Sequence, residues 1–240
     1  MKKKDFNILV ACEESQEITK RFREMGFNCY SCDIIECSGG YPQYHIKTDV
    51  TKILKGGFIT TCDNVTRYID KWDMIIAHPP CTYLTVSGNR WYNIEKYGDS
   101  ARERINERNR AIEFFLMFAN FPCKYKAIEN PIGVMSTIYG KPTQIIQPFW
   151  FGETERKATC LWLENLPQLK PTNIVQPNIL YFDNGKKSMS RLYYSGNKKD
   201  RTKMRSKTFP GVAHAIVEQW GNYIIERENI TDEQKTNIYI

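Results

Sequence analysis

The 240-residue sequence contains no apolar run of roughly 18–20 residues, the length that a membrane-spanning helix requires. Its opening residues, MKKKDF, lack the apolar segment of a secretory signal peptide. It also contains no internal repeat. What is left is an ordinary globular composition, with 41% hydrophobic and 25% charged residues. We therefore expect a cytoplasmic protein with one sizeable domain, a small appendage and no membrane contact.

Disulfide bonds are not expected although eight cysteines are present, because a secretory signal is missing. Cys29, Cys32 and Cys37 precede His45, a set of residue types that can bind zinc. However, Cys29 and Cys32 fall within one apparent strand, where their odd offset points the side chains to opposite faces. We therefore expect the cysteines to serve mostly in packing, and we expect no metal.

Positive charge is concentrated in residues 185–207, which carry nine Lys and Arg residues against one acid, Asp200. The net charge of the whole chain is only +7. Such a concentration is typical of a segment that binds a polyanion, although a solvated Lys-rich loop has the same composition. We expect this segment to bind nucleic acid. The candidate contacts are Lys186, Lys187, Arg191, Lys198, Lys199, Arg201, Lys203 and Arg205.

The first half of the chain alternates apolar strands with amphipathic helices, which predicts an α/β fold. The strand FNILVA is followed by a helix in QEITKRFREMGF, although the turn between them lacks the usual glycines of a nucleotide-binding fold. A second strand ends at Asp33 and a third ends near Asp49. The spacing of Asp33 suits an acid that accepts hydrogen bonds from ribose hydroxyls, with a turn or capping role as the alternative. Residues 64–71 are predicted to form the next helix.

The stretch WDMIIAHPPCTYL predicts a short buried strand that ends at two prolines and is followed by Cys81. In open α/β sheets, ligands bind beyond the carboxyl ends of the strands, so Cys81 lies where chemistry is expected. The polar and aromatic residues 82–100 form either a loop that closes over the site or a plain surface connection. A helix is predicted over residues 100–121.

A further strand at residues 125–128 ends in Glu129 and Asn130, again next to a proline. Because parallel strands end at the same edge of a sheet, Glu129 and Cys81 are expected at that edge. The segments KPTQIIQPFWFG and KATCLWL are strand-like, and residues 211–227 predict an amphipathic helix that packs back on the sheet. We divide the chain into a core at 1–163, a basic segment at 164–210, and a helix with a polar tail at 211–240.

This order of motifs resembles the S-adenosylmethionine-dependent DNA cytosine-5 methyltransferases. The motifs HPPCTYL, AIENP, KPTQIIQPFWFG and KATCLWL look like a compact variant often encoded by phages and prophages. The resemblance covers about residues 6–225. It implies a Rossmann-like methyltransferase fold with a small irregular basic insertion, S-adenosyl-L-methionine as cofactor, and duplex DNA from which the target base is flipped.

The resemblance also implies roles for individual residues. Carbon 5 of cytosine accepts a methyl group only after a nucleophile adds at carbon 6, and Cys81 would supply that nucleophile as a thiolate. Glu129 would contact the ring nitrogen and the exocyclic amine, Asn130 would hold the adjoining backbone, and Arg156 would lie near the pyrimidine carbonyl. The implied cofactor contacts are Ala11, Cys12, Glu13, Ser15, Asp33, Asp49, Pro79 and Pro80.

His78 is a candidate substrate contact, because HPPC also resembles the Asp/Asn/Ser-Pro-Pro-aromatic tetrad of amino-methyltransferases. His78 and Cys81 replace the polar acceptor and the aromatic ring of that tetrad, so methylation of carbon is preferred. One alternative keeps the fold and cofactor but acts on RNA, a free nucleotide or a modified pyrimidine. Another is a non-catalytic phage factor that binds nucleic acid or nucleotide.

Overall fold

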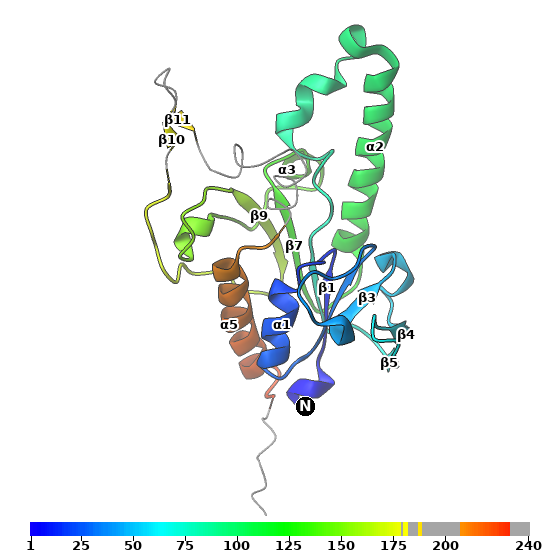
Figure 1. Ribbon diagram of the computed structural model, residues 1–240, viewed down its shortest axis with the longest axis vertical. Coiled ribbons are helices and arrows are strands. Elements are labelled where there is room, and N and C mark those ends of the chain that lie inside the picture. Colours follow the sequence, from blue (N-terminus) through cyan, green and yellow to red (C-terminus); the bar gives the residue numbers. More distant parts are fainter. Residues whose placement is uncertain (179, 182–186, 189–206, 231–240) are drawn as a thin grey trace, which may run out of the picture.

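The computed structural model describes residues 1–178, 180–181, 187–188 and 207–230 (Figure 1). A seven-stranded mixed sheet lies at its centre. In spatial order the strands are β3 (His45–Lys47), β2 (Asn28–Asp33), β1 (Asn7–Ala11), β6 (Met74–Ala77), β7 (Tyr125–Pro131), β9 (Thr159–Glu164) and β8 (Gln144–Ile146). The first five are mutually parallel, whereas β9 runs antiparallel to both β7 and β8. The predicted α/β class with a mostly parallel sheet is confirmed.

Helices cover both faces of the sheet. On one face, α1 (Glu17–Glu24) packs beside α5 (Pro210–Arg227), where Trp220 is fully buried and donates from Nε1 to the Pro167 carbonyl at 2.9 Å. On the other face, α2 (Ile94–Asn120) buries Phe115 and Phe118. The predicted helices at 100–121 and 211–227 are therefore confirmed.

Cys29 and Cys32 belong to the hydrophobic clusters on opposite faces of the sheet, as their odd offset predicts. Burial raises the pKa of both thiols, so neither is a ready nucleophile. These two cysteines are part of the core packing.

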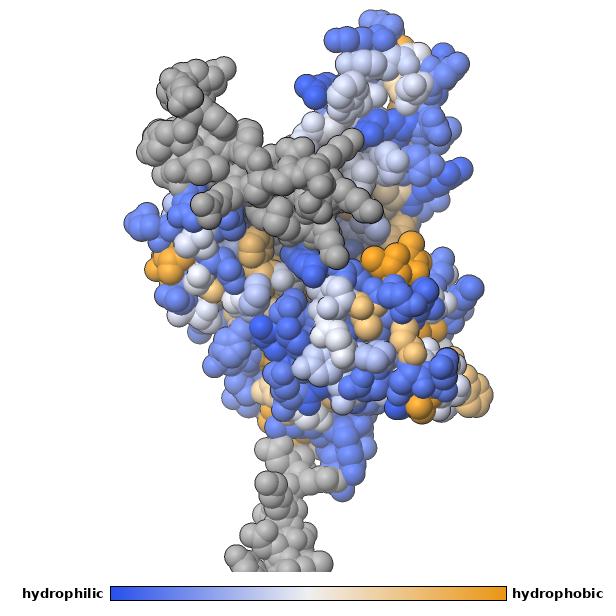
Figure 2. All heavy atoms as spheres, viewed as in Figure 1, coloured by the Kyte–Doolittle hydropathy of each residue, from blue (hydrophilic) through white to orange (hydrophobic). Residues whose placement is uncertain are grey.

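The remaining elements are short. The helix α3 spans Met135–Ile138, and the two-residue strands β10 (Leu180–Tyr181) and β11 (Lys187–Ser188) pair antiparallel. The 3-10 helices lie at Lys3–Asp5, Pro42–Tyr44, Val50–Lys52, Val86–Tyr92 and Pro148–Trp150. Within the described ranges, no helix is long and apolar enough to cross a membrane. In the view of Figure 2, hydrophilic residues make up most of the coloured surface, and hydrophobic ones form separate small patches.

The helix predicted at residues 64–71 is wrong. This segment contains β5 (Thr66–Ile69), which pairs with β4 (Gly57–Thr60) in an antiparallel hairpin outside the main sheet. Asn64 lies in the turn with a φ of 63°, a left-handed conformation that asparagine tolerates better than most residues. The β-branched and aromatic residues of β5 favour an extended strand once that turn has formed.

The parallel register aligns the ends of four neighbouring strands. Ala11 of β1 pairs with Cys32 of β2 and with Ala77 of β6, and Ala77 pairs with Ile128 of β7. The next residue of each strand therefore reaches the same edge of the sheet. These residues are Asp33, Cys12, His78 and Glu129. The predicted meeting of strand ends at one edge is confirmed.

The residues after Cys81 are ordered against α2 (Figure 1). The hydroxyl of Tyr92 and Nε of Arg108 both donate to the Tyr83 carbonyl at 2.9 Å, and the Arg108 guanidinium lies 3.4 Å from the centre of the Tyr92 ring. Between these residues α2 is broken at Gly98, which has φ 52° and ψ −127°. In the structure, the 3-10 helix Val86–Tyr92 packs against α2 and residues 94–100 belong to α2 itself, while closure of residues 82–100 over the site stays a prediction.

Gly133 provides a test of how this segment is held. The Val134 amide donates to the Leu84 carbonyl at 2.9 Å, and a Cβ on Gly133 would lie 2.2 Å from the Leu84 oxygen. Because that neighbour is backbone, Gly133→Ala must displace the turn that carries Cys81. We expect a loss of about 1–3 kcal/mol in the free energy of unfolding, measured by urea denaturation.

The matched control is Thr137→Ala, four residues further along, where the side chain is exposed. It should change the free energy of unfolding by less than about 0.5 kcal/mol. Equal stability of the two variants would show that the close approach at Gly133 does not constrain the turn.

Candidate functional site

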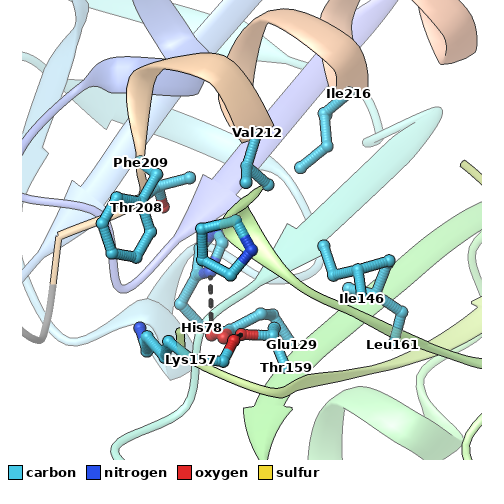
Figure 3. Close-up of a pocket in the computed structure, with 11 residues that line it drawn as sticks. His78, Glu129, Ile146, Lys157, Thr159, Leu161, Thr208, Phe209, Val212 and Ile216 are labelled. Atoms are coloured by element: carbon cyan, nitrogen blue, oxygen red, sulfur yellow. Dashed lines mark hydrogen bonds and ion pairs between the residues drawn. The ribbon is translucent and has the colours of Figure 1, made fainter. Parts of the chain in front are cut away.

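Two pockets meet at the edge of the sheet where the strand ends align, and they share His78 and Thr208. We name the first the acidic pocket. It is lined by Cys12, Glu13, Glu14, Ser15, Asp33, Ile35, His78, Lys207 and Thr208. We name the second the apolar pocket. It is lined by His78, Glu129, Ile146, Pro148, Lys157, Thr159, Leu161, Thr208, Phe209, Val212 and Ile216 (Figure 3).

The first turn, between β1 and α1, is built without glycine. Cys12 has a φ of 61° and Gln16 a φ of 58°, both in the left-handed region where glycine is the usual residue. The Cys12 amide donates to the Cys32 carbonyl at 2.7 Å. The buried Gln16 amide donates to the Tyr41 carbonyl at 2.9 Å and accepts from the Tyr41 amide at 3.0 Å. These contacts offset the cost of the left-handed backbone, which is about 1–2 kcal/mol per residue.

Glu13 closes the start of α1 with its own carboxylate. This buried group accepts from the Ile18 amide at 2.6 Å and from the Thr19 hydroxyl at 2.7 Å. Burial raises the pKa of Glu13, and the hydrogen bonds from Thr19 and Ile18 oppose that rise. The amides that would otherwise offer an anion site at this helix end are therefore occupied by the chain itself.

Asp33 lies at the end of β2, and its carboxylate accepts from the Ile35 amide at 3.2 Å. Burial raises the pKa of Asp33, and because less water competes there, its hydrogen bonds to hydroxyl groups are stronger than those of an exposed acid. Asp49 is exposed, caps a 3-10 helix through Thr51 and lines neither pocket. Burial and the charges of Asp33 and Asp49 raise the pKa of the Cys12 thiol, which therefore stays neutral.

His78 and Glu129 form the polar end of the apolar pocket (Figure 3). His78 Nδ1 lies 3.4 Å from Glu129 Oε2, and the His78 side chain is only 10% exposed. Its other ring nitrogen, Nε2, is buried and has no hydrogen-bond partner within the described residues. Burial alone would raise the pKa of Glu129, but the Lys157 ammonium and His78 hold it below its usual value. His78 thus faces the apolar pocket and contacts Glu129 there, in addition to following the end of β6.

Asn130 supports the adjoining backbone, as the resemblance implies. Its buried Nδ2 donates to the Pro79 carbonyl at 2.8 Å, while Oδ1 has no partner within the part of the chain that is described. Pro79 is buried, Pro80 is exposed and Ala11 lies buried inside β1. Ala11, Pro79 and Pro80 line neither pocket.

Cys81 lies three residues beyond His78, at the expected edge of the sheet. It is half-buried, and its carbonyl accepts from the amides of Leu84 at 3.0 Å and Thr85 at 3.2 Å. Its side chain lines neither of the two pockets. Cys81 therefore follows the shared histidine closely in the sequence, but the structure does not place it on the wall of either pocket.

Arg156, predicted to lie near a pyrimidine carbonyl, is exposed and lines neither pocket. Its neighbour Lys157 lines the apolar pocket together with Thr159 and Leu161. These three positions alternate along the approach to β9 and along the strand itself, so their side chains face the same side. This period of two is the sequence signal that could have identified Lys157, whereas the resemblance pointed to Arg156.

Most of the Lys/Arg-rich residues 185–207 lie outside the described residues. This applies to the predicted nucleic-acid contacts Lys186, Arg191, Lys198, Lys199, Arg201, Lys203 and Arg205. Lys187 belongs to β11. Lys207, at the end of the segment, donates from Nζ to the Ser38 hydroxyl at 3.1 Å and lines the acidic pocket. Among the described side chains, no group of three or more His, Cys, Asp and Glu residues is arranged to hold a metal ion.

The charge of Lys157 can be tested through Glu129. We expect Lys157→Gln to raise the pKa of Glu129 toward its usual value, because a neighbouring positive charge is lost. A lowered pKa in the folded state stabilises the protein above the ordinary titration range of glutamate. That contribution is lost as the pH falls through the lowered pKa, so the variant should lose stability at neutral pH and match the wild type in acid.

The measurements are the side-chain carboxyl 13C titration of Glu129 and urea unfolding at neutral and acid pH. Arg156→Gln is the matched control, since it removes an exposed charge one residue away. If both variants moved the Glu129 titration equally, the specific placement of Lys157 would be refuted.

The site thus offers carboxylates on one side of His78 and an apolar slot with a polar end on the other. Because the two pockets share His78 and Thr208, ligands bound in them would be neighbours. The chain matches no protein-family model and no curated protein.

Proposed function

We propose that the protein is an S-adenosylmethionine-dependent methyltransferase that acts on carbon 5 of cytosine in DNA through a covalent adduct with Cys81. The observation that carries this proposal is the meeting of two chemically distinct pockets at His78. One has Glu13 and Asp33, two of the three acids expected around the cofactor, and the other has Glu129, the acid expected at the base. The fold would then be of the Rossmann-like methyltransferase type, and the order of its parallel strands is compatible with that.

The acidic pocket fits a cofactor without phosphate. Glu13 occupies the amides at the start of α1, and among the described residues that line the pocket, Glu13, Glu14 and Asp33 outnumber the one Lys or Arg residue, Lys207. A phosphate would be repelled by these carboxylates and would find no available helix end. S-Adenosylmethionine carries a sulfonium and an ammonium group, and its ribose hydroxyls can donate to Asp33. When bound, it supplies an electrophilic methyl group.

The side chains that line the apolar pocket suit a planar base with one polar edge. Ile146, Leu161 and Val212 supply apolar walls, while Glu129 and Thr159 lie at the polar end. A carboxyl group there can pair with a ring nitrogen and an exocyclic amine, which is the edge that distinguishes cytosine. Removing a base from a duplex costs a few kcal/mol, and phosphate contacts from the basic segment would offset this cost.

Cofactor binding can be tested without catalysis. We expect Asp33→Ala to weaken S-adenosylmethionine binding about 10- to 100-fold, because a hydrogen bond to a charged group contributes about 1.5–3 kcal/mol. Isothermal titration calorimetry would measure the dissociation constant. Asp63→Ala, which removes an acid of the β4–β5 hairpin, is the control and should leave binding unchanged. Equal affinity in all three proteins would exclude Asp33 from the cofactor site.

The reaction can be tested with purified protein, labelled S-adenosylmethionine and a panel of duplex DNA, RNA and free nucleotides. We expect label in DNA, recovered as 5-methylcytosine in the nucleosides, and a loss of at least about a thousandfold in Cys81→Ser. Cys62→Ser, which changes a thiol next to the hairpin, should retain transfer. Transfer to RNA or nucleotides alone would reject DNA as substrate, and full activity of Cys81→Ser would reject the covalent mechanism.

A further inference from the structure

His78 lines both pockets, and one of its ring nitrogens makes no hydrogen bond within the described residues. Nδ1 faces Glu129 Oε2 at 3.4 Å, whereas Nε2 is buried without a partner within the described residues. A buried polar atom left without a hydrogen bond costs about 1–3 kcal/mol. Proteins tolerate such a cost where the polar group binds a ligand or takes part in a reaction, so we look for a role of the His78 ring beyond packing.

The proposed reaction supplies a reason for such a role. When a thiolate adds to carbon 6 of cytosine, electrons move onto ring nitrogen N3, which must then gain a proton. Glu129 is the group at this edge, but Lys157 and His78 favour its ionised form. An ionised carboxylate can accept hydrogen bonds from the base but has no proton to give. A nearby group must therefore hold that proton.

We propose that His78 and Glu129 act as a proton-sharing pair, in which the imidazole holds the proton that the carboxyl group passes to N3 of the target base. The inference rests on the proposed function and deepens it by assigning a proton-supplying role, exerted through Glu129, to a residue that the resemblance does not explain. An imidazole suits the task because it is the side chain that changes its charge nearest to neutral pH. Its Nδ1 already lies next to the carboxylate.

The proton on N3 moves only between His78, Glu129 and the base, and water takes the proton of carbon 5. As the bond from Cys81 sulfur to carbon 6 forms, the carbon 5–carbon 6 double bond opens and N3 takes the proton of the Glu129 carboxyl group. That proton has reached Glu129 from Nδ1 of the His78 imidazolium, so the imidazole becomes neutral and Glu129 is ionised again. Carbon 5 would then take the methyl group of the sulfonium, whose carbon–sulfur bond electrons stay with the leaving thioether. Carbon 5 next gives its proton to water, the carbon 5–carbon 6 double bond forms again and the Cys81 thiolate leaves. N3 returns its proton through Glu129 to His78.

Charged and titratable groups approach His78 from several elements. Glu129 lies on β7 and Lys157 precedes β9. On the side of the acidic pocket, the groups are Cys12, Glu13, Glu14, Asp33 and Lys207. Glu13 and His78 interact electrostatically across the boundary between the pockets. A change of cofactor occupancy is therefore expected to act on the same pair.

The first test compares rates across pH for the wild type, His78→Asn and Glu129→Gln. The asparagine amide can still donate toward Glu129 but cannot hold the extra proton. We expect His78→Asn to lose about 100-fold in methyl transfer at neutral pH. The fall in rate with rising pH should begin at lower pH, because the carboxyl group alone must then keep the proton and its pKa lies below its usual value. His214→Asn, an exposed histidine on α5, should behave as the wild type.

A second readout needs no cofactor. Addition of Cys81 to carbon 6 and protonation of N3 labilise the hydrogen at carbon 5, so DNA labelled with tritium at that carbon should release it to water. We expect this exchange to follow the same pH profiles as methyl transfer in each variant. A His78→Asn protein with the rate and pH profile of the wild type would overturn the pair. If the wild type showed neither methyl transfer nor tritium release, the proposed function itself would be rejected.

The third readout is independent of activity. The chain has only three histidines, so the imidazole signals of His45, His78 and His214 can be assigned by NMR from single variants. If His78 shares a proton with Glu129, Glu129→Gln should move the midpoint of the His78 titration to lower pH, because a carboxylate that stabilises the imidazolium is removed. The His214 titration should not move. An unchanged His78 titration would refute the pair even in a folded, inactive protein.

Discussion

The parallel pairing of β2, β1, β6 and β7 is the constraint on which the site depends. Their hydrogen-bond ladders place Cys32, Ala11, Ala77 and Ile128 at one level of the sheet. The residue that follows each one is thereby brought to a common edge, although the positions lie as far apart in the chain as 12 and 129. A shift of one residue in any pairing would turn the end of that strand toward the α2 face instead of the α1 and α5 face. The contact between His78 and Glu129 is thus a direct consequence of the register.

This constraint also explains what the sequence could predict. Continuous apolar runs that stop at proline mark both the buried strands and their ends, so the placement of Cys81 and Glu129 at one edge followed from local patterns. The hairpin of β4 and β5 did not follow, because its formation depends on a left-handed turn at Asn64 that competes with a weak helical pattern. Lys157 was missed in favour of Arg156 because the motif position was weighed above the alternation of β9, which decides which side chain faces the pocket.

The first turn shows how a chain can form a ligand pocket without the usual glycines. Cys12 takes the left-handed conformation that glycine would supply, and backbone bonds to Cys32 keep it there. Glu13 then satisfies the amides of α1 that a glycine-rich turn would leave for a phosphate. The missing glycines and the Glu13 cap are coupled. A turn whose amides bind its own carboxylate does not need a glycine backbone that lets a phosphate approach closely. The sequence feature that distinguishes this turn from dinucleotide-binding folds is therefore also the one that would disfavour a phosphate at the start of α1.

The turn at Cys81 is held from two sides, and this has a mechanistic consequence. On one side the Tyr83 carbonyl accepts from Tyr92 and Arg108, and on the other the Leu84 carbonyl accepts from the amide next to Gly133. Gly133 follows Glu129 and Asn130 by a few residues, and Asn130 itself binds the Pro79 carbonyl. The segments that carry the candidate nucleophile and the candidate acid are therefore joined by hydrogen bonds at two points. A nucleophile and an acid that act on one ring must keep a set separation, and an ordered connection between them lowers the entropy that the reaction would otherwise lose on assembling them.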